Sequence, residues 1–332
     1  GGMKESVMKG RIQKNQDRSV KIMDKNTIVI GVDHGWANMK TAGSVFTSGI
    51  KEITTTPALY ENVLEYEGKY YKVGTKRLEV RETKVQDDNY YLLTLAAIGK
   101  ELCRRELKSA HILLAVGLPL TRFGEEKNDF ISYLMRNRKV SFKFEKRQYD
   151  VTIERVSVYP QCYGAVADRL GMFPAKQLVV DIGSWTVDIM PIINRSPDES
   201  ACVTQPHGII TCIRQINKEC VRQLNEEVDE HDIQQVFMTG GDYLPEEYQK
   251  IIFQEIKRYT DKIASNIREL GYNMNLTPIV FVGGGAGVMK RFGNLHQNNI
   301  SYIEDVKANA VGYEILGRTY LNRILQRSRQ GV

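Results

Sequence analysis

The sequence has no long apolar run. Across its 332 residues, no stretch of about 18 apolar residues occurs, so no transmembrane helix is expected. Residues 3–26 are polar and lack the apolar core of a signal peptide. We therefore expect a cytoplasmic protein that does not associate with membranes.

Cysteine is also scarce. The chain has five, none of them in a C-x-x-C pair, and no Cys and His pair has the spacing of zinc ligands. An odd number without paired motifs argues against a disulfide framework and a zinc site. It is typical of reduced thiols in the cytosol.

Excess positive charge is confined largely to the N-terminus. The chain carries +6, and residues 3–26 hold seven Lys or Arg against three Asp or Glu, which leaves the rest near +2. We predict that residues 1–26 form a disordered polar tail or, alternatively, a basic arm for DNA or an acidic partner. The remaining charge gives no support for direct, sequence-specific nucleic-acid binding by the folded part.

What the sequence does contain is a short motif that occurs twice. Residues 32–40 read VDHGWANMK and residues 180–188 read VDIGSWTVD, which places Asp33 and Asp181 148 positions apart. The Gly that follows each Asp permits a tight turn and a close approach of the backbone to an oxyanion. The freed N–H groups, with Asn38 or Thr186, can donate to phosphate oxygens. An Asp at the end of a strand can hold a hydrated Mg²⁺.

Two such motifs predict two related halves that hold one nucleotide between them. Lys40 is a candidate ligand of a β- or γ-phosphate, and Asp188 of a water near the metal; each could equally be a cross-strand partner on a solvated face. The predicted phosphate contacts are Gly35, Trp36, Ala37, Asn38 and Lys40 in the first copy, and Gly183, Ser184, Trp185, Thr186 and Asp188 in the second.

Two further signals complete the predicted site. Gly283, Gly284 and Gly285 follow an apolar strand, and three residues without Cβ leave room for a flat ring and a ribose. Gln161 follows Pro160 at a predicted helix start. A neutral amide at that place can orient an attacking water.

The spacing of apolar residues predicts strands and helices in both halves. Strands are expected over 27–32, 62–73 (a hairpin), 111–118, 140–158 (two strands), 177–180, 187–193, 233–238 and 277–282. Helices are expected over 90–107, 125–137, 160–171, 208–228, 245–270 and 309–325. The length and this order imply two α/β domains with mixed sheets.

The repeated motif resembles the two phosphate motifs of the superfamily that joins actin, the heat-shock chaperone ATPases and the sugar kinases. Residues 282–286 (VGGGA) resemble its adenosine motif, and residues 160–161 (PQ) and 309–312 (NAVG) its two connecting motifs. The D-x-G-x-x-N-x-K form of the first motif and the GLP at 117–119 are similar to the bacterial actin-like plasmid segregation proteins, the ParM/StbA group. The resemblance covers residues 27–325.

This resemblance implies an actin-like ATPase fold, with two RNase H-like domains around a central nucleotide cleft. Residues 27–158 with 308–328 would form domain I, and residues 159–307 domain II. It implies hydrolysis of ATP, or of GTP, with Mg²⁺, coupled to self-assembly into helical filaments. In this family such filaments segregate plasmid DNA through a DNA-bound adaptor protein.

The resemblance also implies roles for single residues. Asp33 and Asp181 would position Mg²⁺ and water, and Gln161 would orient the attacking water. The plasmid proteins carry Glu at the position of Gln161, whereas actin has Gln. Trp36 and Trp185 stand where small residues are common, which predicts a different shape for the two turns.

Two other functions fit the same superfold. A small-molecule kinase would need an Asp base aimed at a hydroxyl substrate, and the sequence offers no candidate beyond the motif carboxylates. A bacterial cytoskeletal relative outside segregation, of the MreB-like or FtsA-like kind, would bind membranes through an apolar or amphipathic terminus. We expect neither end of this chain to provide one.

Overall fold

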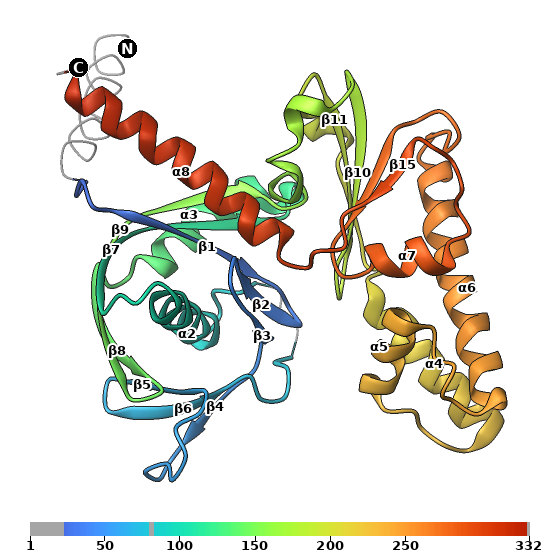
Figure 1. Ribbon diagram of the computed structural model, residues 1–332, viewed down its shortest axis with the longest axis horizontal. Coiled ribbons are helices and arrows are strands. Elements are labelled where there is room, and N and C mark those ends of the chain that lie inside the picture. Colours follow the sequence, from blue (N-terminus) through green and yellow to red (C-terminus); the bar gives the residue numbers. More distant parts are fainter. Residues whose placement is uncertain (1–22, 80–82, 331–332) are drawn as a thin grey trace, which may run out of the picture.

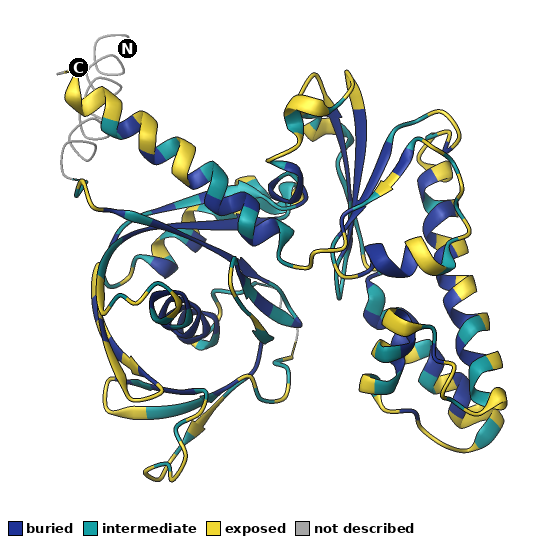
Figure 2. Ribbon diagram, in the orientation of Figure 1, coloured by how far each residue is buried: buried dark blue, intermediate teal, exposed yellow. Residues whose placement is uncertain are grey.

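The computed structural model describes residues 23–79 and 83–330 (Figure 1). The tail predicted over residues 1–26 lies almost wholly outside these ranges. The described chain forms two sheets, and a long C-terminal helix runs beside the first of them (Figure 1). Figure 2 shows that the buried residues gather in the interior of each part.

The first sheet has nine strands in the order β3-β2-β1-β7-β9-β8-β5-β6-β4. β1, β7 and β9 run parallel to one another, and the other neighbouring pairs are antiparallel. The strands are β1 (Ile28–His34), β2 (Asn38–Thr41), β3 (Val45–Thr47), β4 (Ile50–Ile53), β5 (Val63–Tyr66), β6 (Lys69–Val73), β7 (Ser109–Leu118), β8 (Lys139–Phe144) and β9 (Arg147–Pro160).

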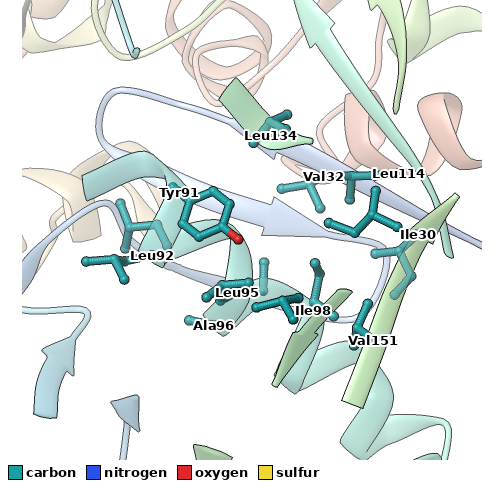
Figure 3. Packing of buried hydrophobic residues seen from close by; sticks show 14 of the residues in the cluster. Ile30, Val32, Tyr91, Leu92, Leu95, Ala96, Ile98, Leu114, Leu134 and Val151 are labelled. Atoms are coloured by element: carbon teal, nitrogen blue, oxygen red, sulfur yellow. The ribbon is translucent and has the colours of Figure 1, made fainter. Parts of the chain in front are cut away.

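This sheet curls around helix α2 (Asn89–Arg104), as Figure 1 shows. Residues 90–99 of α2 are buried without a break, and a helix that is apolar on all sides belongs inside a core. α3 (Phe123–Leu134) adds Phe130 and Leu134 to the same core. Figure 3 shows α2 residues packed against strands of this sheet, among them Tyr91, Leu95, Ile98, Ile30, Val32, Leu114 and Val151.

The second sheet has six strands, with β12-β11-β10-β14-β15 in order and β13 paired with β11. β10, β14 and β15 are parallel. The strands are β10 (Lys176–Ile182), β11 (Val187–Ile193), β12 (Ser196–Pro197), β13 (Val203–Gln205), β14 (Ile279–Val282) and β15 (Ile300–Tyr302). The helices that accompany it are α4 (Ile209–Leu224), α5 (Glu230–Thr239), α6 (Glu246–Glu269) and α7 (Ala286–Phe292).

Helix α8 (Ala308–Arg329) follows the second sheet in the chain but packs on the first. Its Tyr313 and Leu321 share a cluster with Val29 of β1 and with Leu113 and Ala115 of β7. Helix α8 therefore covers β1 and β7, and it also packs on Gly164–Val166.

The start of α8 passes very close to the segment that follows β9. A Cβ on Gly312 would lie 1.6 Å from the carbonyl oxygen of Gly164. Real Cβ atoms do not approach an oxygen so closely, because the two atoms would overlap. Glycine is therefore required at position 312 for the two segments to cross here.

The prediction of an α/β fold with two mixed sheets is confirmed, but residues 160–171 do not form the predicted helix. Pro160 ends β9, and Cys162 adopts a left-handed conformation with φ of 73°. A left-handed residue cannot continue a right-handed helix. Two short 3₁₀ helices, Gly164–Val166 and Leu170–Met172, take its place.

The strand predicted over 233–238 is also wrong, because these residues lie in helix α5. The carboxylate of Asp229 caps the helix by accepting a backbone N–H two residues on. Ile233, Val236 and Phe237 are buried at helical spacing. Gly240, with φ of 94°, ends the helix. Four apolar residues in a run of six did not distinguish a period of 3.6 from a period of two.

Candidate functional site

Each sheet carries one copy of the repeated motif as a hairpin, and the two hairpins have the same register. β1 pairs with β2 so that Asp33 lies opposite Lys40. β10 pairs with β11 so that Asp181 lies opposite Asp188. Four residues separate the last paired positions of each hairpin, His34 with Met39 and Ile182 with Val187, and in both the Gly comes two residues after the Asp. The repeat in the sequence is therefore also a repeat in backbone pairing.

The first loop is held by hydrogen bonds from outside the motif. The carbonyl of Gly35 accepts from Ser48 Oγ at 2.7 Å and from the Tyr90 hydroxyl at 3.2 Å. A Cβ on Gly35 would lie 2.3 Å from the carbonyl oxygen of Asn38, so the tight turn requires glycine.

Lys40 meets its strand neighbour at the end of this hairpin. The buried carboxylate of Asp33 accepts from Lys40 Nζ at 3.2 Å. The cross-strand role that the sequence left open for Lys40 is thus occupied in this structure. Lys40 would have to leave or share this ion pair to reach a phosphate.

The second loop is held by the beginning of α4. The carbonyl oxygens of Gly183, Ser184 and Trp185 accept from the backbone N–H groups of residues 209, 210 and 208, at 3.0, 2.9 and 3.1 Å. In a trans peptide the N–H of the next residue points away from the carbonyl. The N–H groups of Ser184, Trp185 and Thr186 therefore point away from α4, which leaves them available to an anion.

The two tryptophans of the motifs do not occupy the same role. Trp36 is half-buried and makes an edge-to-face contact with Tyr90, with ring centroids 5.7 Å apart. Trp185 packs against the core of the second sheet, and the guanidinium of Arg214 lies 4.7 Å from its ring centroid. Their bulk is thus used for packing around the loops.

Asp181 is buried and tied to the start of α8. Asn309 Nδ2 donates to Asp181 Oδ2 at 2.9 Å. The other side of the same amide, Asn309 Oδ1, accepts from the backbone N–H of Cys162 at 3.2 Å and of Ala165 at 3.0 Å. Burial raises the pKa of Asp181, the nearby charge of Asp33 raises it further, and the Asn309 hydrogen bond opposes both.

The three glycines after β14 close around the same strand end. Gly283 has φ of 84°, and a Cβ on it would lie 2.3 Å from Asp181 Oδ1. Gly285 donates its N–H to the carbonyl of Ile182 at 2.9 Å, and its Cβ would lie 2.2 Å from Ile182 Cγ2. Only Gly284 faces open space, with nothing within 4 Å of its Cβ position. The glycine loop therefore fits closely against β10 and leaves one backbone position open to a ligand.

Gln161 and Asp188 line one small cavity of about 10 Å³, together with Thr121 and Thr204. That volume is about the space one water molecule needs. Thr204 Oγ1 donates to Asp188 Oδ1 at 2.5 Å, and Thr121 and Thr204 hydroxyls lie 2.8 Å apart. Burial raises the pKa of Asp188 to about 7, and the neighbouring Asp181 adds to this. Gln161 lies in a turn and not at a helix start.

A cleft of about 270 Å³ opens between the first hairpin with β3 on one side and helices α4 and α5 on the other, and neither Asp33 nor Asp181 lines it. Ala37 and Asn38 line it from the first hairpin and Ser184 from the second. Arg77, which follows β6, forms an ion pair across it with Glu230 of α5. A larger cavity of about 500 Å³ lies elsewhere, against the first residues of β1 and β7, and no predicted site residue lines it.

The structure adds two residues that the sequence did not single out as ligands. Asn309 belongs to a segment recognised only as a connecting motif, and its contact with Asp181 spans 128 positions. Lys84 lies in the connection between β6 and α2, with its Nζ 5.1 Å from the Trp36 ring centroid. No local pattern indicated the contact of either residue, because each contact joins segments that are far apart in the sequence.

No self-contained metal centre is present among the described residues. Within residues 23–79 and 83–330, no group of three or more His, Cys, Asp or Glu side chains gathers as ligands. Two carboxylates, Asp33 and Asp181, fit instead an ion such as Mg²⁺ that keeps several waters and also binds phosphate oxygens.

Among the helices of residues 23–79 and 83–330, none combines the length and the apolar character of a membrane span.

Comparison with known proteins connects both halves of the chain to one group of folds. A sequence-family model described as the N-terminal domain of actin-like proteins matches residues 18–164. A second, described as the C-terminal domain of an archaeal MreB-like actin homologue, matches residues 179–293. No curated protein matches the sequence.

Solved structures with the same fold cover nearly the whole chain. The apo psk41 ParM protein has a TM-score of 0.69 at 17% identity, over 91% of this chain and 100% of its own. The archaeal actin homologue Ta0583 in its complex with ADP has a TM-score of 0.69 at 20% identity, over 88% and 100%. The Alp12 filament structure has a TM-score of 0.68 at 17% identity, over 89% and 99%.

Proposed function

Because the chain belongs to the actin-like proteins, we propose that it is a filament-forming nucleoside triphosphatase that segregates plasmid DNA. It would bind ATP, or GTP, with Mg²⁺ in the cleft between its two sheets. Its partners would be further copies of itself and a DNA-bound adaptor protein, in the cytoplasm.

The observation that carries this proposal is the pair of hairpins in matched register. Each carries an Asp one residue before the end of a strand of a different sheet, and loop residues of both hairpins line one cleft. A single nucleotide that contacts both loops would hold the two sheets at a fixed distance. Such a site explains why the same short motif is needed twice in one chain.

The residues at the cleft have distinct proposed roles. Backbone N–H groups of the two loops, with Asn38 and Thr186, would donate to phosphate oxygens, as oriented amides do in other anion sites. Lys40 would share its charge between Asp33 and a phosphate. The backbone at Gly284 would leave space for the ring and ribose beside it.

Asp33 and Asp181 would hold the water shell of Mg²⁺, which would neutralise charge on the phosphates when bound. Gln161 would orient the attacking water by hydrogen bonding, without adding charge. Asp188 lines the same small cavity, and its pKa of about 7 suits a group that accepts a proton near neutral pH.

Hydrolysis would change the contacts between the two parts. A triphosphate that bridges both loops favours the closed cleft, and loss of the terminal phosphate removes contacts on one side. A filament that selects the closed state then links assembly to the bound nucleotide. Two similar structures, the Alp12 filament and a non-polymerisable quadruple mutant of pCBH ParM, support the proposal that this chain also assembles with itself.

The experiment follows right-angle light scattering and phosphate release together, after mixing the protein with Mg-ATP, Mg-GTP or Mg-ADP. We expect scattering to rise with one triphosphate and to decay as phosphate appears. Flat scattering with steady phosphate release would contradict a polymer and favour a monomeric NTPase or a kinase, and a panel of sugar substrates would then distinguish the two.

Asp181→Ala sharpens this test. The variant should still bind nucleotide but hydrolyse it slowly, so its filaments should outlast those of the wild type. Asp242→Ala, an exposed carboxylate away from the cleft, is the matched control and should behave as the wild type. Fast disassembly of Asp181→Ala filaments would refute the assigned role.

A further inference from the structure

Lys84 lies over an aromatic platform at the first phosphate loop. Its Nζ is 5.1 Å from the ring centroid of Trp36 and 5.9 Å from that of Tyr90. The two rings meet edge to face, and Tyr90 is fixed by its hydroxyl donating to the Gly35 carbonyl. Trp36 and Tyr90 thus position the ammonium group beside the loop, through cation–π attraction.

The charges around Lys84 come from both sides of the cleft. Asp33 and Glu126 attract it, Lys40 and Arg122 repel it, and these residues belong to the first sheet and its helices. Its own charge also acts on Asp188 of the second hairpin. Lys84, which lies beside Trp36 of the first loop, is thus within electrostatic reach of a carboxylate in each hairpin.

Lys84 has no carboxylate partner in the part of the chain that the structure describes. No oxygen of Asp or Glu among residues 23–79 and 83–330 lies within ion-pair distance of its Nζ, although Lys40 nearby has one. Burial lowers its pKa to about 8. A partly desolvated ammonium that contacts no carboxylate among residues 23–79 and 83–330 is costly, and a bound anion would offset that cost.

We propose that Lys84 binds the terminal phosphate of a nucleoside triphosphate and is the residue that distinguishes triphosphate from diphosphate. This inference rests on the proposed function, because it assigns the anion to the nucleotide that the two hairpins hold. Its ammonium lies against Trp36 of the first loop, where it could contact a terminal phosphate that bridges both loops.

The placement of Lys84 also gives the bulky Trp36 a purpose. A small residue at position 36 would leave the ammonium of Lys84 without this aromatic ring. Arg77, on the same connection between β6 and α2, pairs with Glu230 across the cleft. Of the residues between β6 and α2, Arg77 thus contacts the opposite side of the cleft, and Lys84 would contact the phosphate.

The test compares the full-length protein with Lys84→Met, which keeps the length of the side chain but removes its charge. Calorimetric titration gives dissociation constants for a Mg²⁺-bound β,γ-imido triphosphate, for the diphosphate, and for the diphosphate with inorganic phosphate. Lys76→Met, an exposed lysine on the same connection, is the matched control. Lys84→Arg tests whether charge alone restores binding.

We expect Lys84→Met to weaken triphosphate binding at least about tenfold, as loss of a charge-assisted hydrogen bond does, and to change diphosphate binding less than about twofold. Inorganic phosphate should improve diphosphate binding in the wild type but not in Lys84→Met. Lys76→Met should alter none of these, and Lys84→Arg should recover part of the triphosphate preference.

A second readout follows from the two tryptophans of the chain, at positions 36 and 185. In Trp185→Phe, the emission reports Trp36 alone, and it should shift with triphosphate when Lys84 moves from the ring to the phosphate. The shift should vanish in the double variant with Lys84→Met.

Equal weakening of triphosphate and diphosphate, or no weakening, would overturn the assignment of Lys84 while leaving nucleotide binding intact. Failure of the wild type to bind any nucleotide would instead refute the proposed function itself. The two failures are therefore distinguishable from the same titrations.

Discussion

Replacing Asn309 should destabilise the protein more than any other single polar change at the cleft. This one amide joins three segments: it donates to Asp181 and accepts from the N–H groups of Cys162 and Ala165. It is 9% exposed, so water replaces these contacts poorly. Asn309→Ala would leave a buried carboxylate and two buried N–H groups without this partner.

The magnitude follows from those three hydrogen bonds. A hydrogen bond to a charged group contributes about 1.5–3 kcal/mol, and a buried backbone group left unpaired costs about 1–3 kcal/mol. Allowing for partial relaxation, we expect Asn309→Ala to lower the free energy of unfolding by about 3–6 kcal/mol. Because the Asn309 hydrogen bond opposes the rise of the Asp181 pKa, that pKa should rise further in the variant.

Urea unfolding of the nucleotide-free protein measures this change. Asn322→Ala, an exposed asparagine on the same helix, is the control and should stay within about 0.5 kcal/mol of the wild type. Asn309→Asp keeps the acceptor for both N–H groups but places a second carboxylate beside Asp181, so it should also destabilise. A loss below about 1 kcal/mol for Asn309→Ala would refute the reasoning.

Two other predictions concern pH and packing. Burial raises the pKa of Asp188 from 3.8 to about 7, so between these values the folded nucleotide-free protein holds a proton that the unfolded chain has released. The free energy of unfolding should therefore fall as pH rises, by at most about 2 kcal/mol between pH 5 and pH 7. Urea unfolding of Asp188→Asn should show a smaller change with pH. An equal change in the variant and the wild type would contradict the raised pKa of Asp188. Gly312→Ala should lower the free energy of unfolding by more than about 3 kcal/mol, because its Cβ would lie 1.6 Å from a carbonyl oxygen. Gly124→Ala in α3, whose Cβ would have nothing within 4 Å, should leave stability unchanged. Similar melting temperatures for the two variants would contradict the close crossing.

The sequence could predict the local parts of this site. The two hairpins were expected from a repeated motif, and their registers agree residue for residue because a tight turn of fixed length sets the pairing of its strands. The glycine loop was also expected from a local pattern, but its three glycines have different surroundings. Gly283 and Gly285 fit against Asp181 and Ile182, and only Gly284 faces open space.

The misassigned elements show where local patterns are insufficient. Residues 233–238 form too short a run to separate a helix from a strand by periodicity. In the structure, Asp229 caps a helix that buries one face. Residues 160–171 had the composition of a helix, but Asn309 draws the N–H groups of Cys162 and Ala165 into a different turn. That acceptor lies on a helix nearly 150 positions later in the chain.

The sequence by itself determined the fold class, the two matching hairpins and the carboxylate near the end of the first strand of each. These depend on residues within a few positions of one another, whose turn chemistry and periodicity are local. Only the tertiary structure decided that Asn309 holds Asp181, that Lys84 lies on Trp36, and that Arg77 pairs with Glu230. Each of these contacts joins segments brought together by the return of α8 or by the facing of the two sheets, and no short-range pattern encodes them.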